Sequence, residues 1–216
     1  AAELARTFEA LNANVRIDVQ TGGSSRGLAD ASKGLADIGM VSKAVNHPNV
    51  TATLLARDGL AVILHSSNPT AALSREQLVQ IYRGERTQWP GSDQAISVVH
   101  KADGRSTQQI FLEHFALQAN EIKAAVIVGD NEQGIKTVAG NPGAIGYVSI
   151  GAAQYSQRAG VPIKLLPLDG VAATVENVSN GSYPLARELN WVTANPPQGL
   201  AKAFIDFSAT DKGHEI

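Results

Sequence analysis

Two short turns rich in glycine and hydroxyl residues carry the side chains best suited to bind an anion. The first reads Thr21-Gly-Gly-Ser-Ser-Arg-Gly27 and precedes an apolar pattern with helical spacing. A helix that begins there presents unpaired backbone N–H groups and the positive end of its dipole. The hydroxyls of Ser24 and Ser25 add donors, and Gly22 and Gly23 allow close approach of a ligand. This turn predicts an anion site, although an ordinary serine cap after a glycine turn explains the same residues.

The second turn reads Lys101-Ala-Asp-Gly-Arg-Ser-Thr107 and links a predicted strand to a predicted helix. Lys101 and Arg105 lie beside the N-terminus of that helix, where positive charge opposes the helix dipole. A bound anion would remove this conflict, which favours a binding function over two cations that point to solvent or pair with Asp103. The side chains expected to bind the anion here are Lys101, Arg105, Ser106 and Thr107.

An enzymatic alternative uses the first turn in another way. GSSRG at 23–27 matches the G-x-S-x-G pattern of hydrolases, with Ser25 as the nucleophile and Asp206 and His214 as triad partners in the required order. Only one predicted strand precedes Ser25, so no earlier loop is available to stabilise an oxyanion, and His214 lies near the end of the sequence. A serine esterase is therefore the less favoured alternative, and we expect no catalytic residues.

Metal and cofactor chemistry lacks its usual residues in this sequence. The chain contains no cysteine, and its five histidines show neither H-E-x-x-H nor a paired spacing. The G-x-x-x-x-G-K-[ST] pattern of nucleotide-binding loops is also absent. We expect neither a metal ion nor a cofactor.

The segments around the two turns alternate between strand and helix patterns, which predicts an α/β fold. Strands are expected over residues 15–20, 37–41, 60–64, 96–99, 144–148, 163–166 and 185–192. Helices are expected over residues 4–11, 25–33, 75–83, 105–117, 132–139 and from 196 onward. Ser74 and Gln77 form a capping box at the start of one helix. Ser42 follows the strand over 37–41 and joins the first turn only if the fold places it beside Ser24.

Two turn-rich joints divide the chain. Residues 65–69 read HSSNP and residues 180–184 read NGSYP, and each joint adjoins an apolar strand. This predicts a discontinuous layout, in which one lobe contains residues 1–64 and 184–216 and the other lobe, inserted between them, contains residues 65–183.

Composition excludes several classes of protein. The chain has 216 residues, a formal net charge of −2, an isoelectric point near 6.2 and a mean hydropathy of −0.07. No global basic field indicates a nucleic-acid partner, and no apolar run approaches the roughly 18 residues of a membrane span. The absence of cysteine suits an oxidising compartment.

Segments spread over nearly the whole chain occur in the order of a known family. They are GGSSRG at 22–27, ADIGMVSKAV at 36–45, DGLAVILHSSNP at 58–69, LSREQLVQIYRGERTQWP at 73–90, VVHKADGRSTQQIF at 98–111, NPGAIGYVSIG at 141–151, NGSYPLARELNWVT at 180–193 and KAFIDFSATDKG at 202–213. The chain resembles the substrate-binding component of bacterial phosphate ABC transporters, a class II periplasmic binding protein. NPGAIGYVS and SYPLARELN are the most specific of these segments, whereas GGSS alone is not specific.

The resemblance implies a class II periplasmic-binding-protein fold, in which two α/β lobes joined by two hinge-crossing strands close on inorganic phosphate. Ser24 and Thr107 match phosphate-binding positions of the family. Lys101 stands where the family often has an arginine, and Arg105 and Ser106 stand in its serine-glycine-threonine stretch.

Ser42 matches a position that in some members is an aspartate, which accepts the proton of phosphate. Such a carboxylate also repels sulfate, which has no proton to share. Asp37 and Asp103 are the candidate substitutes, and sulfate or another oxyanion stays an alternative ligand.

The resemblance also implies partners and a location. The chain would deliver phosphate to the membrane subunits of an ABC importer from a periplasmic or other extracytoplasmic position, secreted or lipid-anchored. We expect a monomer that binds no nucleic acid. In the family, a strand and a phosphate-contacting loop come before the position that matches Ala1, so we expect such a segment ahead of this sequence.

Overall fold

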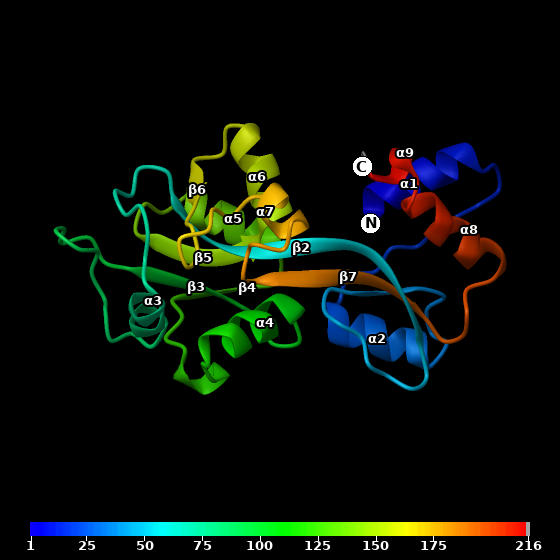
Figure 1. Ribbon diagram of the computed structural model, residues 1–216, viewed down its shortest axis with the longest axis horizontal. Helices are drawn as coiled ribbons and strands as arrows, with labels where there is room; N and C mark the ends of the chain where they lie inside the picture. The colour runs from blue at the N-terminus through cyan, green and yellow to red at the C-terminus, as the bar shows by residue number, and fades with distance from the viewer. Residues whose placement is uncertain (215–216) are drawn as a thin grey trace. The chain divides into compact units, whose positions relative to one another are not determined.

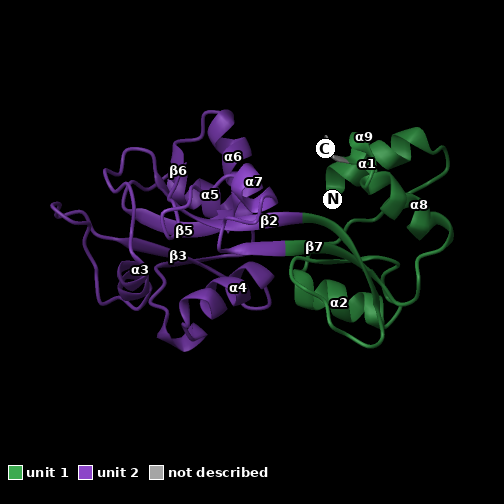
Figure 2. Ribbon diagram, viewed as in Figure 1, with its two compact units in different colours: residues 1–56, 188–216 green, residues 57–187 purple. Residues whose placement is uncertain are grey.

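The chain folds into two units (Figure 1, Figure 2). Each unit has its own apolar clusters. The structure, a computed structural model, describes residues 1–214. Unit 1 comprises residues 1–56 and 188–216, and unit 2 comprises residues 57–187. The chain passes between the units twice, within strand β2 (Thr51–His65) and within strand β7 (Ala186–Thr193).

The boundaries between the units differ from the joints expected from sequence, because residues 57–64 and 184–187 belong to unit 2. Leu60 and Leu64 are buried in the apolar core of unit 2, together with Leu185. The HSSNP turn follows the end of β2, and the NGSYP turn precedes the start of β7. Each turn therefore marks an end of a long strand within unit 2 rather than a joint between the units.

Unit 2 contains a mixed sheet in which β3 is parallel to both of its neighbours. Besides β2, its strands are β3 (Ser97–Lys101), β4 (Val126–Val128), β5 (Ala144–Ser149) and β6 (Ile163–Leu165). β5 is antiparallel to β2 and parallel to β3, with Ile145 opposite Leu64 on one side and Val98 on the other. Because β3, β4 and β5 run in one direction, their carboxyl ends lie at the same edge of the sheet.

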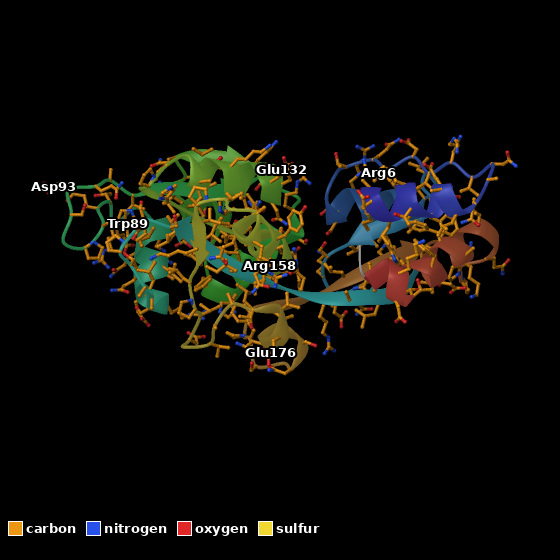
Figure 3. All side chains as sticks on the ribbon, turned by 90° about the horizontal axis from the view of Figure 1, so that it is seen from above. Arg6, Trp89, Asp93, Glu132, Arg158 and Glu176 are labelled. Atoms are coloured by element: carbon orange, nitrogen blue, oxygen red, sulfur yellow. The ribbon has the colours of Figure 1, made fainter. Side chains whose placement is uncertain are left out.

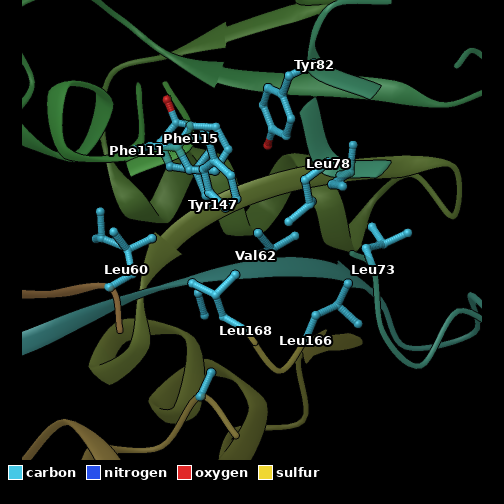
Figure 4. Packing of buried hydrophobic residues seen from close by; sticks show 14 of the residues in the cluster. Leu60, Val62, Leu73, Leu78, Tyr82, Phe111, Phe115, Tyr147, Leu166 and Leu168 are labelled. Atoms are coloured by element: carbon cyan, nitrogen blue, oxygen red, sulfur yellow. The ribbon is translucent and has the colours of Figure 1, made fainter. Parts of the chain in front are cut away.

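Helices cover both faces of this sheet (Figure 1). They are α3 (Arg75–Tyr82), α4 (Ser106–Phe115), α5 (Asn131–Ala139), α6 (Ile150–Arg158) and α7 (Val175–Ser179), with a 3-10 turn η1 (Ala119–Glu121). Val62 and Leu64 of β2 pack in the cluster that holds α3 and α4, whereas Ile63 packs in the cluster that holds α5 and α6. Phe111 of α4 stacks on Tyr147 of β5, with 3.9 Å between ring centroids and 6° between planes (Figure 4). This packing holds the middle of α4 against the sheet.

Unit 1 contains a short strand pair between helices. Besides β7, its elements are α1 (Ala2–Leu11), α2 (Ser24–Ser32), β1 (Gly39–Val41), α8 (Gly199–Ser208) and α9 (Asp211–His214). β1 pairs antiparallel with β7. Trp191 of β7 packs with α1 and α8, and the next residue, Val192, packs with Ala31 of α2 and Val41 of β1. The alternation of β7 residues thus places α2 on the opposite face from α1 and α8.

Several segments fold differently from the expectation. Residues 15–20 form no strand within the described chain, although their burial alternates, because no neighbouring strand pairs with them. β2 begins at Thr51 rather than at residue 60. The sequence does not reveal its first half, because exposed residues alternate there and form no apolar run. β4 was not expected, because it has three residues and both Val126 and Ile127 are exposed.

Candidate anion site

The carboxyl edge of the unit 2 sheet brings the starts of three helices together, since α4, α5 and α6 follow β3, β4 and β5. Two of these starts are capped by side chains. Asp130 accepts from the Gln133 N–H at 2.8 Å in α5, and Ser149 accepts from the Ala152 N–H at 3.4 Å in α6. Arg105, at the equivalent position of α4, makes no side-chain capping bond. The second turn therefore leads into α4, whose start lacks the side-chain cap that α5 and α6 have.

The start of α4 leaves backbone donors unpaired among residues 1–214. The first helical bond runs from the Gln109 N–H to the Arg105 carbonyl at 3.2 Å, and the N–H groups of Ser106, Thr107 and Gln108 precede it without a partner. These three residues are only 6–8% exposed. Buried N–H groups at the positive end of a helix dipole are well suited to hold an anion.

Lys101 brings a cation into the same region. Its side chain is buried, and its Nζ donates to the backbone carbonyl of Asp130. Burial, the largest cause, lowers the pKa of Lys101 to about 8, the Asp130 carboxylate opposes this change, and Arg187 and Arg105 add to it. The two arginines are therefore close enough to repel the lysine ammonium. An anion bound near these groups would relieve the repulsion.

Arg105 is a half-buried cation without an ion pair in the described chain. Its Nη2 is 3.6 Å from the position that a Cβ on Gly129 would occupy, so the guanidinium reaches the loop between β4 and α5. Asp103, the alternative partner considered for it, instead accepts from Gln108 Nε2 at 2.7 Å. Glu132 of α5 lies on the surface of unit 2 and pairs with a lysine of its own helix (Figure 3). These acids leave the charge of Arg105 available to a ligand.

Arg187 is a residue of this region that sequence reasoning missed. Its Nη1 donates to Thr107 Oγ1 at 2.9 Å, while its Nε and Nη2 donate to Asp58 Oδ2 at 3.1 and 2.8 Å. Ser149 Oγ donates to the other carboxylate oxygen of Asp58 at 3.0 Å. The pair joins residues 129 positions apart in the chain, so no local motif reveals it. The one signal was the place of Arg187 within the specific segment SYPLARELN.

In unit 1 a hydrogen bond joins two residues of the first predicted site. Ser24 Oγ accepts from the Ser42 N–H at 2.9 Å, so the fold places Ser42 beside Ser24. Glycines allow this, because a Cβ on Gly39 would lie 2.2 Å from the carbonyl oxygen of Gly27. α2, like α4, begins without a side-chain capping bond. Ser25, the second residue of α2, is exposed.

The described part of the structure does not bring together the three residues that an esterase triad would need, Ser25, Asp206 and His214. No strand precedes Ser25 within the described residues. Asp206 pairs with Lys202 of its own helix at 2.5 Å. The side chain of His214 lies outside the described part of the structure. The pattern around Ser25 therefore lacks the strand that a nucleophile elbow requires.

Known proteins resemble the whole chain. A family model for the PBP superfamily domain matches residues 1–212. The phosphate-binding protein PstS of Bacillus subtilis is 30% identical over 212 residues, which cover 94% of this chain and 69% of that protein. The chain belongs to the PBP superfamily and, within it, to the PstS phosphate-binding proteins.

Two solved structures of phosphate transport proteins support this assignment to the PstS family. A putative phosphate ABC transporter substrate-binding protein from Clostridium perfringens, solved with bound phosphate, has a TM-score of 0.86 at 31% identity, over 99% of this chain and 89% of that one. An ABC-type phosphate transport receptor from Vibrio cholerae has a TM-score of 0.77 at 27% identity, over 99% and 90% of the two chains. The expected α/β periplasmic-binding-protein fold is confirmed.

Membership of the PstS family decides between binding and catalysis. The family consists of substrate-binding proteins of transport and not of enzymes, so the esterase alternative at Ser25 is set aside. Within residues 1–214, no helix is both long and apolar enough to cross a membrane. The same residues contain no cluster of three or more histidine, aspartate or glutamate side chains placed to hold a metal ion.

Proposed function

We propose that this chain binds inorganic phosphate at the start of α4 and supplies it to the membrane subunits of an ABC importer. The observation that carries the proposal is the uncapped start of α4, where buried N–H groups adjoin the cations Lys101 and Arg105. The PstS relative is named a phosphate-binding protein, and the Clostridium perfringens relative holds phosphate. Both findings support the choice of ligand.

The groups at this site are donors, which suits a phosphate dianion that accepts hydrogen bonds on all its oxygens. Lys101 and Arg105 supply charge, while Ser106 and Thr107 supply hydroxyl and backbone donors. Each charge-assisted hydrogen bond contributes about 1.5–3 kcal/mol. Several such bonds, less the costs of ordering and desolvation, reach the ~8 kcal/mol that corresponds to micromolar affinity.

For unit 1 we propose that Ser24, Ser25 and Ser42 also bind phosphate. The uncapped start of α2 supports this proposal. The hydrogen bond from the Ser42 N–H occupies an acceptor position of Ser24 Oγ and leaves its O–H free to donate. Ser24→Ala is expected to weaken phosphate binding in the titration described next, and unchanged affinity would remove Ser24 from the site.

Thr107→Val is expected to weaken phosphate binding by about tenfold, because it removes one hydroxyl donor and keeps the shape of the side chain. It also removes the acceptor of Arg187 Nη1, so the free energy of unfolding should fall by about 1–3 kcal/mol. Isothermal titration with inorganic phosphate measures the dissociation constant. Thr137→Val is the matched control, since the Thr137 hydroxyl lies in α5 and donates to the Gln133 carbonyl at 2.8 Å. Equal affinities of Thr107→Val and the unchanged chain would exclude the Thr107 hydroxyl from the site.

The same titration distinguishes phosphate from sulfate. Ser42 supplies no carboxylate to accept the proton of phosphate. The candidate substitutes are Asp37, before β1, and Asp103, in the turn before α4. Asp103 accepts from Gln108 through one carboxylate oxygen, Oδ1. We expect phosphate and arsenate to compete for the site while sulfate does not. Equal competition by sulfate would change the proposed ligand to oxyanions in general.

Phosphate affinity is expected to fall about tenfold per pH unit above 8, because Lys101, with a pKa of about 8, loses its proton in the free chain. The charged lysine is the form that attracts an anion, and phosphate itself stays a dianion in this range. Lys101→Arg is the matched control, since a guanidinium stays charged and should make the affinity nearly independent of pH. An equal fall in both proteins would assign the pH dependence to another group.

We further propose an extracytoplasmic location, with the chain secreted or lipid-anchored, and a monomeric state without a nucleic-acid partner. The PstS family and the phosphate-transporter names of the solved relatives support the location and the transporter partner. The formal net charge of −2 supports the absence of nucleic-acid binding. Sedimentation of the purified chain with and without phosphate tests the monomeric state, which a dimer would contradict.

A further inference from the structure

The ion pair between Arg187 and Asp58 lies next to the proposed phosphate site without belonging to the residues assigned to it. Asp58 is the second residue after the chain enters unit 2, and Arg187 is the last residue before the chain passes back into unit 1. The side chains of Arg187 and Asp58 are 6% and 11% exposed. A charge pair this well buried is costly to form unless further hydrogen bonds satisfy it.

Those further hydrogen bonds connect the pair to the starts of two helices. Arg187 Nη1 donates to Thr107 Oγ1 in α4 at 2.9 Å, and Ser149 Oγ, which also caps α6, donates to Asp58 Oδ1 at 3.0 Å. Both oxygens of the carboxylate are occupied, so Asp58 holds the guanidinium in one orientation.

The direction of the bond to Thr107 is the decisive feature. A guanidinium only donates, so Thr107 Oγ1 must act as the acceptor in this contact. The O–H of Thr107 then points elsewhere, and it meets no acceptor among residues 1–214. A charged donor on the oxygen also polarises the O–H and strengthens it as a donor.

We propose that Arg187, held by Asp58, is a positioning residue that orients the Thr107 hydroxyl as a donor toward phosphate. This inference rests on the proposed function and adds a residue with no assigned role in it. Arg187 acts through Thr107 rather than through contact with the anion. Its effect on phosphate affinity should therefore depend on whether residue 107 carries a hydroxyl.

A double-mutant cycle tests this dependence. Arg187→Lys keeps a cation beside Asp58. It replaces the planar guanidinium, which donates to both Asp58 and Thr107, with a single ammonium group. We expect Arg187→Lys alone to weaken phosphate binding about five- to tenfold by isothermal titration. In a Thr107→Val background the same change should alter the affinity less than about twofold, whereas in a Thr107→Ser background its full effect should return.

Controls separate positioning from general loss of structure. Arg83→Lys is matched, because Arg83 forms another partly buried pair in unit 2, with Glu121 at 2.8 Å, and should leave phosphate affinity unchanged. If Arg187→Lys does not fold, the cycle is repeated with Asp58→Asn, which keeps the guanidinium and weakens its anchor.

The outcomes distinguish this inference from the function on which it rests. Failure of the unchanged chain to bind phosphate would overturn the proposed function before any variant is compared. Phosphate binding that Arg187→Lys weakens equally in the Thr107 and Thr107→Val backgrounds would overturn the positioning role alone. An unchanged affinity in Arg187→Lys itself would do the same.

Discussion

Lys101→Met is expected to weaken phosphate binding by about 30- to 100-fold while leaving the fold at least as stable as before. Binding weakens because the variant loses a buried positive charge that interacts with Arg105, the residue before α4. The fold does not suffer, because Met has nearly the length of Lys and places no charge in a buried position. The Asp130 carbonyl keeps a donor, since the Gly134 N–H also bonds to it at 3.3 Å.

The pKa of Lys101 gives the sign of the stability change. It is about 8 in the folded chain and has its usual value of 10.5 in the unfolded chain, so the unfolded chain binds the proton more tightly. The charged lysine therefore destabilises the fold fully below pH 8, and this cost disappears as the pH rises toward 10.5. At pH 7, Lys101→Met should raise Tm by roughly 2–8 °C, from a stabilisation of about 1–3 kcal/mol.

Lys136→Met is the control for Lys101→Met, because it removes the same charge from an exposed position on α5. It should change neither phosphate affinity nor Tm appreciably. Calorimetric titration and a thermal melt of the three proteins provide the measurements. A Lys101→Met chain that binds phosphate normally but melts earlier would show that Lys101 supports the fold rather than the ligand.

Gly39→Ala is expected to lower Tm by roughly 2–8 °C, which corresponds to a loss of about 1–3 kcal/mol in the free energy of unfolding. The new Cβ would lie 2.2 Å from the Gly27 carbonyl oxygen and 2.8 Å from Val192 Cγ2, so α2 must move away from β1. That movement would break the 2.9 Å hydrogen bond between Ser42 and Ser24. We therefore expect weaker phosphate binding as well.

Gly151→Ala provides the matched glycine substitution. The nearest atom to its new Cβ is Ser149 Oγ at 3.8 Å, which is ordinary contact, and alanine favours the helix α6. Its Tm should be unchanged or slightly higher. Equal Tm values for Gly39→Ala and the unchanged chain would show that α2 and β1 do not require the close approach.

Local features of the site could be predicted from the sequence. The conflict between the cations Lys101 and Arg105 and a helix dipole is visible within seven residues, and α4 starts where that conflict predicts. The capping box of Ser74 and Gln77 is likewise local and is present at the start of α3. Such features depend only on residues that are close together in the sequence, so the motif itself contains all the groups that determine them.

Features that depend on distant neighbours could not be predicted. From the sequence, Ser42 belongs to the first site only if the fold places it beside Ser24. The hydrogen bond between them requires α2 to lie against β1, which the sequence does not show. Arg187 and Asp58 meet through the pairing of strands, which neither local segment reveals. The same reason explains why residues 15–20 alternate without forming a strand, since a strand exists only where a partner edge is available.

Amide chemical shifts measured during a titration with inorganic phosphate test the central claim most directly. If phosphate binds at the start of α4, the N–H signals of Ser106, Thr107 and Gln108 should shift in slow or intermediate exchange and saturate near one equivalent. The Ser24 and Ser42 signals should shift with them if the proposed unit 1 residues also bind. Saturating phosphate that leaves the three α4 signals in place would contradict the site.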